Sequence, residues 1–261
     1  MLTATKASMI LIRVTDSLIN VFMLITIMLL FALGCYAMWD SGQVRHAASS
    51  ARYERYRPTA EDDGASFAYL QAKNPDVFAW LTIYGTNIDY PVVQGKDNIR
   101  YVNTNAEGKH CLSGAIFLDF RNASAFADFN NILYGHHMDS RTMFGEIGMF
   151  IDKDYFNTCK YGTLFFDGQT HGLEFFAFVH TDAHNRNVFR TNITSEEARQ
   201  TYLDLLLEEA IHTRESVRVT VDDRIVLLTT CSSNSTNGRD ILVGKITENI
   251  SAGSKELNGY D

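Results

Sequence analysis

An uncharged apolar run near the N-terminus constrains this chain more than any other feature. From Ser17 to Trp39 no side chain carries a charge. As an α-helix rising 1.5 Å per residue, residues 18–39 would measure about 33 Å. The hydrocarbon core of a bilayer is about 30 Å thick. The run therefore predicts a transmembrane helix over residues 17–39, with Tyr36 and Trp39 at a membrane–water boundary.

A cleaved signal peptide is the alternative interpretation of this run. Such a leader has a shorter apolar region and ends in a small-x-small cleavage site. The segment from Cys35 to Trp39 contains no good site of that kind, so we expect an uncleaved signal anchor. Lys6 and Arg13 precede the span and Asp40 follows it. This charge bias predicts a single-pass protein of the cell membrane, with residues 1–16 in the cytoplasm and the remainder outside the cell.

Two segments follow the predicted span. Residues 40–63 are polar, with four arginines and an acidic cluster at Glu61, Asp62 and Asp63, and they predict a juxtamembrane stalk that is helical in part. Residues 64–261 are long enough to bury one core and predict a single extracellular domain.

Charge and cysteine content exclude two broad classes of protein. The formal net charge of −8 makes the chain a poor candidate for binding nucleic acid, because phosphate contacts require a basic face. Four cysteines are too few for a disulfide scaffold. Cys35 lies in the span, which leaves Cys111, Cys159 and Cys231 outside. Because that number is odd, at least one exported thiol has no partner within the chain.

Short β segments dominate the predicted extracellular domain. Strands are expected over residues 78–84, 88–94, 113–120, 131–135, 163–167, 173–181, 216–221, 225–230 and 241–247. Pro91 suggests that the second of these is an edge strand. Helices are expected over residues 66–73 and 195–210, the second opened by a capping box of Thr194 and Glu197. Many strands with few helices favour a β-barrel or sandwich.

One cysteine stands at the end of an apolar strand. The sequence Leu-Leu-Thr-Thr of residues 227–230 leads directly into Cys231, and a polar loop follows. A rigid strand end can hold a thiol at the rim of a cleft, which is a suitable position for a nucleophile. A buried structural cysteine is the alternative from these residues alone.

Histidine and arginine side chains follow two other strands. Tyr134 and Gly135 lead into His136 and His137, and an imidazole near a thiol can support the thiolate and later protonate a leaving amine. We expect no metal site, since neither a His-Glu-x-x-His nor a Cys-x-x-Cys pattern is present. Arg239 precedes the strand after the cysteine. If those two strands pair, its guanidinium can stabilise an oxyanion; an exposed loop arginine is the alternative.

Taken together, these features resemble the sortases, the membrane-anchored cysteine transpeptidases of Gram-positive bacteria. The sortase nucleophile motif is Thr-Leu-x-Thr-Cys, followed by an arginine at the start of the next strand. Here Leu227 replaces the first threonine, while Cys231 and Arg239 match. The similarity to class B sortases extends over almost the whole chain. It includes Trp39-Asp40-Ser41, the segments from Asp89 to Gly95, Gly114 to Asp119 and Tyr134 to Met138, and Met143-Phe144-Gly145.

The resemblance implies a mostly β fold, a closed eight-stranded β-barrel with flanking helices, preceded by one N-terminal transmembrane helix. It also implies that Cys231 attacks the threonine carbonyl of a C-terminal sorting signal in a secreted protein. Arg239 would stabilise the oxyanion, and His136, in preference to His137, would protonate the leaving nitrogen. An amine would then accept the acyl group, either a peptidoglycan cross-bridge or a pilin lysine. No cofactor or metal is implied.

Four further residues are candidates for binding the substrate. Thr229, Thr230 and Ser232 flank the thiol, and Tyr134 lies next to the histidine, although sheet packing would explain each of them equally well. Two other functions stay open. The chain would be a hydrolytic cysteine peptidase if it lacked an amine-acceptor site. It would be a non-catalytic, membrane-anchored binding module if Cys231 were buried and Arg239 made a surface ion pair.

Overall fold

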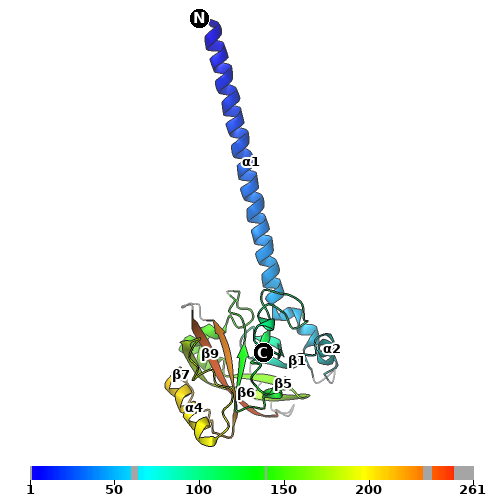
Figure 1. Cartoon of the computed structure of the whole chain (residues 1–261), viewed down its shortest axis with the longest axis vertical. Coiled ribbons are helices and arrows are strands. Elements are labelled where there is room, and N and C mark those ends of the chain that lie inside the picture. The colour runs from blue at the N-terminus through cyan, green and yellow to red at the C-terminus, as the bar shows by residue number, and fades with distance from the viewer. Residues whose placement is uncertain (1, 60–63, 139, 232–236, 250–261) are drawn as a thin grey trace. The chain divides into compact units, whose positions relative to one another are not determined.

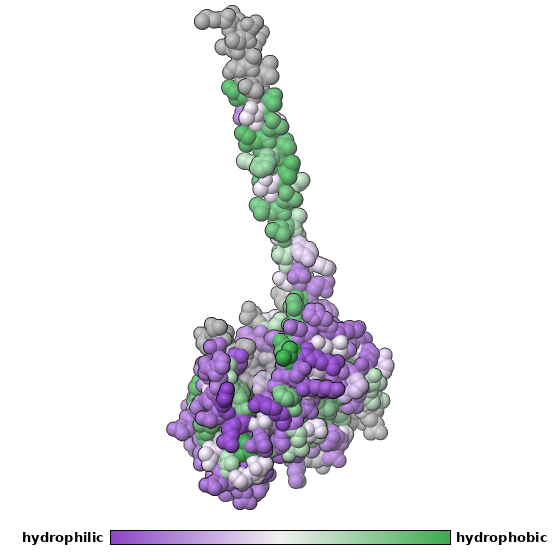
Figure 2. Space-filling view, in the orientation of Figure 1, coloured by the Kyte–Doolittle hydropathy of each residue, from purple (hydrophilic) through white to green (hydrophobic). Residues whose placement is uncertain are grey.

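The computed structural model describes residues 2–59, 64–138, 140–231 and 237–249. Contacts divide the chain into two units, Met1–Val44 and Arg45–Asp261. One unbroken helix, α1, covers Leu2–Ala48 (Figure 1). Its segment Ile12–Ala48 is long and apolar enough to cross a membrane, and the apolar side chains of this segment are exposed from Ile12 to Trp39 (Figure 2). The expected N-terminal helix is present, and it continues beyond the predicted span.

The second unit contains nine strands among the described residues. Their bounds are β1 Val77–Ile83, β2 Asp89–Val93, β3 Ile116–Leu118, β4 Asn130–Tyr134, β5 Tyr161–Phe166, β6 Gln169–Asp182, β7 Ala210–Thr213, β8 Arg224–Cys231 and β9 Gly238–Asn249. The helices are α2 Ala65–Lys73, α3 Lys153–Thr158 and α4 Glu196–Glu208. Short 3₁₀ helices are η1 Ser50–Arg52, η2 Glu54–Tyr56, η3 Arg100–Val102, η4 Ser124–Phe126 and η5 Ile147–Ile151.

Eight of these strands form a closed ring. Their order is β5-β1-β2-β3-β4-β8-β9-β6, and β6 pairs with β5 to close it. The pairs β2–β3 and β4–β8 are parallel, and the other six pairs of the ring are antiparallel. β7 pairs with β6 outside the ring. The closed eight-stranded barrel implied by the resemblance is therefore confirmed.

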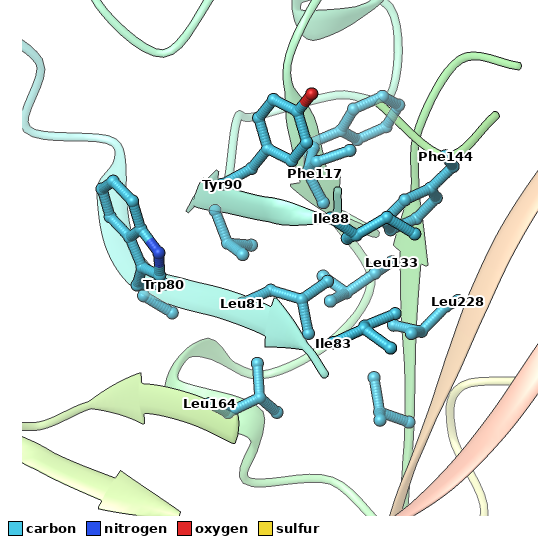
Figure 3. Packing of buried hydrophobic residues seen from close by; sticks show 14 of the residues in the cluster. Trp80, Leu81, Ile83, Ile88, Tyr90, Phe117, Leu133, Phe144, Leu164 and Leu228 are labelled. Carbon is cyan, nitrogen blue, oxygen red and sulfur yellow. The ribbon is translucent and has the colours of Figure 1, made fainter. Parts of the chain in front are cut away.

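Both faces of the central strands are apolar, which is why their sequences are almost continuously hydrophobic. In β8, Val226 and Leu228 belong to the core cluster inside the barrel, where Leu228, Leu81 and Leu133 point toward one another (Figure 3). The alternate residues, including Leu227, belong to a second cluster with side chains of α4, which lies beside β6 and β7 (Figure 1). Strands covered on both faces lose the polar alternation of a half-exposed strand.

Three local expectations were wrong. Residues 216–221 form no strand, and β7 is Ala210–Thr213 instead. Val217 packs against the second cluster without a hydrogen-bonded ladder. The cap of α4 is Ser195, whose side chain accepts a hydrogen bond from the backbone of Ala198 at 3.2 Å, rather than Thr194. Finally, β2 lies between β1 and β3 and is not an edge, since its pairing with β3 begins just after Pro91.

The segment just before the barrel also contributes to its core. Tyr53 and Tyr56, from the region predicted as a stalk, are buried in the main cluster. The hydroxyl of Tyr56 donates to Glu107 at 2.8 Å, and Arg52 contacts the same carboxylate at 2.7 Å. These contacts attach η1 and η2 to the loop that follows η3.

Candidate active site

His136 is positioned by the end of β4. The parallel pairing of β4 with β8 sets Tyr134 beside Thr229, and Gly135 donates to the carbonyl of Thr229 at 3.2 Å. A Cβ on Gly135 would come within 2.6 Å of Ile116 and 2.7 Å of a phenylalanine ring. This close approach requires glycine, and it places the next residue, His136, where the chain leaves the sheet.

The tautomer of His136 follows from its hydrogen bond. Its Nε2 lies 2.8 Å from the backbone carbonyl of Val102. A carbonyl oxygen only accepts, so Nε2 carries a proton and donates it. The backbone carbonyl of His136 in turn accepts from Phe144 at 3.0 Å. The ring is therefore held at Nε2 and the backbone of His136 by the second bond, while no described residue occupies Nδ1.

Cys231 and Arg239 lie directly opposite one another. In the antiparallel pair of β8 and β9, Thr229 faces Ile241, and Cys231 faces Arg239. The two strands pair as the sequence argument required, so a separation of eight residues becomes a cross-strand neighbour. The structure describes the backbone of Cys231, and Ser232 lies outside the described residues.

A cavity of about 420 Å³ brings the other candidates together. It is lined by Asn98, Val102, Phe117, Tyr134, Gly135, His136, Thr229, Thr230 and Arg239. Five of the seven sequence-predicted site residues therefore share one cavity. Thr229 is 1% exposed, and the hydroxyls of Thr229 and Thr230 have no hydrogen-bond partner among the described residues. Two buried hydroxyls beside a cavity are suited to hydrogen-bonding a ligand.

Arg239 is half-buried, and its guanidinium is not paired with a carboxylate in the described part of the chain. Its Nη1 donates to the neighbouring carbonyl of Gly238 at 2.9 Å. An arginine in a cavity wall can stabilise a negative charge that develops on a bound substrate, provided that no carboxylate already pairs with its guanidinium. The ion pair expected for a non-catalytic module is not found among the described residues.

Tyr134 is held by a buried carboxylate. Its hydroxyl donates to Asp119 at 3.0 Å, and Arg121 binds both oxygens of Asp119, at 2.9 and 2.7 Å. Burial alone would raise the pKa of Asp119, but the hydrogen bonds and charge of Arg121 lower it below its ordinary value. Burial and the negative charge of Asp119 raise the pKa of Tyr134. Tyr134 is therefore a fixed, neutral hydrogen-bond donor.

Sequence reasoning missed several residues of this site. Asn98 and Val102 come from the segment between β2 and β3, where the sequence shows no regular pattern, and nothing local indicates that their loop reaches His136. Asp119 belongs to a motif of the resemblance, but its sequence context indicates no role for it. Their positions depend on strand pairing that is remote in sequence.

The other two cysteines outside α1 are in different surroundings. Cys159 is buried, its Sγ lies 3.7 Å from the carbonyl of Gly85, and burial raises the pKa of its thiol. The Sγ of Cys111 lies 3.0 Å from the Ser113 hydroxyl. Neither residue lines the cavity. Within the described residues, no three His, Cys, Asp or Glu side chains gather as a metal site would need.

Comparison with known proteins identifies the family. No family model matches the chain. Over 184 residues, however, it is 34% identical to Sortase B of Staphylococcus aureus, covering 69% of this chain and 74% of that protein. The chain belongs to the class B sortases. As a sortase it is a cysteine transpeptidase.

Solved sortases have the same fold. The sortase B from the Type II pilus of Streptococcus pneumoniae is 44% identical, with a TM-score of 0.61, and the match covers 69% of this chain and 98% of that one. A sortase B complexed with triglycine is 29% identical, with a TM-score of 0.71, and covers 80% of this chain and 100% of that one. These relatives favour the transpeptidase over the peptidase and binding-module alternatives.

Proposed function

We propose that this sortase cleaves a C-terminal sorting signal through a thioester on Cys231 and transfers the acyl group to an amine. The observation that carries the proposal is the pairing of Cys231 with Arg239 across β8 and β9, in a cavity wall that Arg239 shares with His136. A nucleophile, an oxyanion donor and a proton donor are the three groups that acyl transfer needs.

In the proposed acylation step, the Cys231 thiolate attacks the carbonyl carbon of a threonine in the signal. The carbonyl oxygen becomes an oxyanion, to which Arg239 donates hydrogen bonds. As the tetrahedral intermediate collapses, the C–N bond breaks, and His136, as imidazolium, protonates the leaving nitrogen. The Val102 carbonyl occupies Nε2, so Nδ1 is the nitrogen that transfers this proton.

In the second step an amine attacks the thioester. The now neutral His136 takes a proton from the attacking nitrogen, a new amide bond forms, and the thiolate leaves. Arg239 again stabilises the oxyanion. The cycle regenerates the thiolate and the imidazolium, and it uses no cofactor.

Substrate binding is proposed for the residues beside these groups. The hydroxyls of Thr229 and Thr230 would hydrogen-bond the peptide backbone, since both are buried against the cavity without a described partner. The ring of Tyr134 would form an adjoining wall. Ser232 remains a candidate on the sequence alone.

The partners and location are proposed on the same basis. Residues 1–16 would lie in the cytoplasm, residues 17–39 would anchor the enzyme, residues 40–63 would link it to the membrane, and residues 64–261 would act outside the cell. The acceptor would be a peptidoglycan cross-bridge amine or a pilin lysine. One similar structure is from a pilus and another holds triglycine, so both kinds of amine belong in the test.

The test uses the full chain in detergent micelles with a panel of sorting-signal peptides. Each peptide is offered with triglycine or with a lysine-containing peptide, and intact masses are read for protein and products. An acyl adduct on Cys231 together with a ligated product supports the proposal and identifies the acceptor. Cleavage without ligation to any amine, or no adduct with any peptide, contradicts it.

Matched variants test the three roles. Cys231→Ala should abolish the adduct. His136→Ala and Arg239→Ala should each lower the transfer rate by about 100-fold or more, whereas His137→Ala serves as the neighbouring control. Cys111→Ala and Cys159→Ala should retain most of the activity. A loss with Cys111→Ala equal to that with Cys231→Ala would overturn the assignment of the nucleophile.

A further inference from the structure

A second cavity adjoins the active site and is rich in arginine. It measures about 680 Å³ and shares Tyr134 and Arg239 with the first cavity. Its other lining residues include Arg121, Arg186 and Arg190, and no aspartate or glutamate is among the described residues that line it. Four arginines in one cavity are unexpected in a chain whose formal net charge is −8.

The loop that carries two of these arginines is firmly held. It connects β6 to α4, and buried groups of the barrel and of α4 bind its backbone. Asn130 donates to the carbonyl of Arg190 at 2.6 Å, and the Tyr202 hydroxyl donates to the carbonyl of Val188. Arg121 donates to the carbonyl of Phe189 at 3.3 Å. The backbone of this wall is therefore preorganised, which lowers the entropy lost when a ligand binds.

The charges on this wall are largely uncompensated. Arg121 is neutralised by Asp119. Arg186 and Arg190 are exposed, and neither makes an ion pair with a described residue. The acid nearest to Arg186 along the chain, Asp182, is engaged by the backbone and ring of the histidine two residues later, at 2.8 and 2.9 Å. The acid nearest to Arg190, Glu196, lies in the first turn of α4. The cavity thus presents guanidinium groups that are free to bind an anion.

We infer that this second cavity binds a carboxylate of a peptide ligand, with Arg186 and Arg190 as the binding residues. A guanidinium matches a carboxylate with two parallel hydrogen bonds. The inference rests on the proposed function, because the shared Tyr134 and Arg239 make the cavity continuous with the site of acyl transfer. The carboxylate belongs either to the sorting-signal peptide or to the amine-bearing acceptor.

The test measures binding without turnover, by isothermal titration of the full chain carrying Cys231→Ala in detergent micelles. The acceptor arm compares triglycine with triglycine amide. The donor arm compares two acetylated, amidated pentapeptides with threonine at position four, which differ by glutamate or glutamine at position one. In one of these arms, the carboxylate form should bind about three- to tenfold more tightly, and the advantage should shrink as salt is added.

Two charge-matched variants decide the outcome. Arg186→Gln with Arg190→Gln should remove the preference for the carboxylate form, whereas Lys153→Gln with Arg218→Gln, which alters two exposed cations elsewhere on the barrel unit, should retain it. The arm that shows the preference identifies the source of the carboxylate. No preference in either arm, or a preference that survives the first double variant, overturns the inference.

Failure of the inference is distinguishable from failure of the proposed function. Acyl transfer without any carboxylate preference would refute the inference alone. A carboxylate preference that depends on Arg186 and Arg190, in a protein that forms no adduct on Cys231, would leave the inference standing and refute the transfer.

Discussion

Replacing Glu107 with glutamine should destabilise the barrel strongly at neutral pH and much less in acid. The Glu107 side chain is 4% exposed. It accepts hydrogen bonds from Arg52 at 2.7 Å and from Tyr56 at 2.8 Å, and Arg55 and Lys73 lie within 3.3 and 3.9 Å. Burial raises the pKa of this carboxyl, but the hydrogen bonds and the surrounding positive charge lower it more, to about 2 from an ordinary 4.5.

This shift sets both the magnitude and its dependence on pH. A carboxyl whose pKa falls from 4.5 to about 2 on folding stabilises the folded state by about 3 kcal/mol at neutral pH. The stabilisation is fully present above the pKa of the unfolded chain and is lost as the pH falls through the pKa of the folded chain. The difference in unfolding free energy between the wild type and Glu107→Gln should therefore become smaller as the pH falls from 4.5 to 2.

The assay is urea unfolding of the full chain in detergent micelles, followed by the fluorescence of the buried Trp80. Glu54→Gln is the control, because Glu54 is exposed in the neighbouring turn η2 and makes no ion pair with a described residue. At pH 7 we expect Glu107→Gln to lower the free energy of unfolding by about 3 kcal/mol and the control variant to leave it unchanged. A difference below about 1 kcal/mol at pH 7, or one that is equally large at pH 3, would refute the reasoning.

Three further substitutions have defined outcomes. Asp119→Asn removes the negative charge that pairs with Arg121, and thermal unfolding should show a loss of about 2 kcal/mol in the free energy of unfolding. An unchanged melting temperature would contradict the role of this carboxylate. Ser195→Ala removes the N-cap of α4 and should lower the free energy of unfolding in urea by about 1 kcal/mol, and Thr194→Ala should lower it clearly less. A larger loss for Thr194→Ala would indicate that Thr194 is the cap. Gly145→Ala would press a Cβ against the Met138 carbonyl oxygen and should lower the free energy of unfolding by about 1–3 kcal/mol. Wild-type stability in calorimetry would contradict this, because it would mean that the loop moves to make room for the methyl group.

Continuous apolar runs made the central strands predictable. The runs expected at residues 225–230 and 241–247 correspond to β8 and β9. Their hydrophobicity is covered on both faces, by the barrel core and by the second cluster. A different signal was misleading at residues 216–221, where apolar and polar side chains alternate. Such alternation indicates partial burial and does not indicate a hydrogen-bonded partner strand.

The amino-acid sequence by itself determined the apolar helix, the family, and the residue types from which the site is built, because hydropathy and motif order are properties of the covalent chain. Only the tertiary structure decided which groups face one another. Arg239 lies opposite Cys231 because β8 and β9 pair in one particular register. His136 donates to Val102, and Arg186 and Arg190 line a cavity beside Tyr134, because loops distant in sequence pack together. Such contacts depend on burial and on hydrogen bonds between remote segments, for which a local pattern carries no signal.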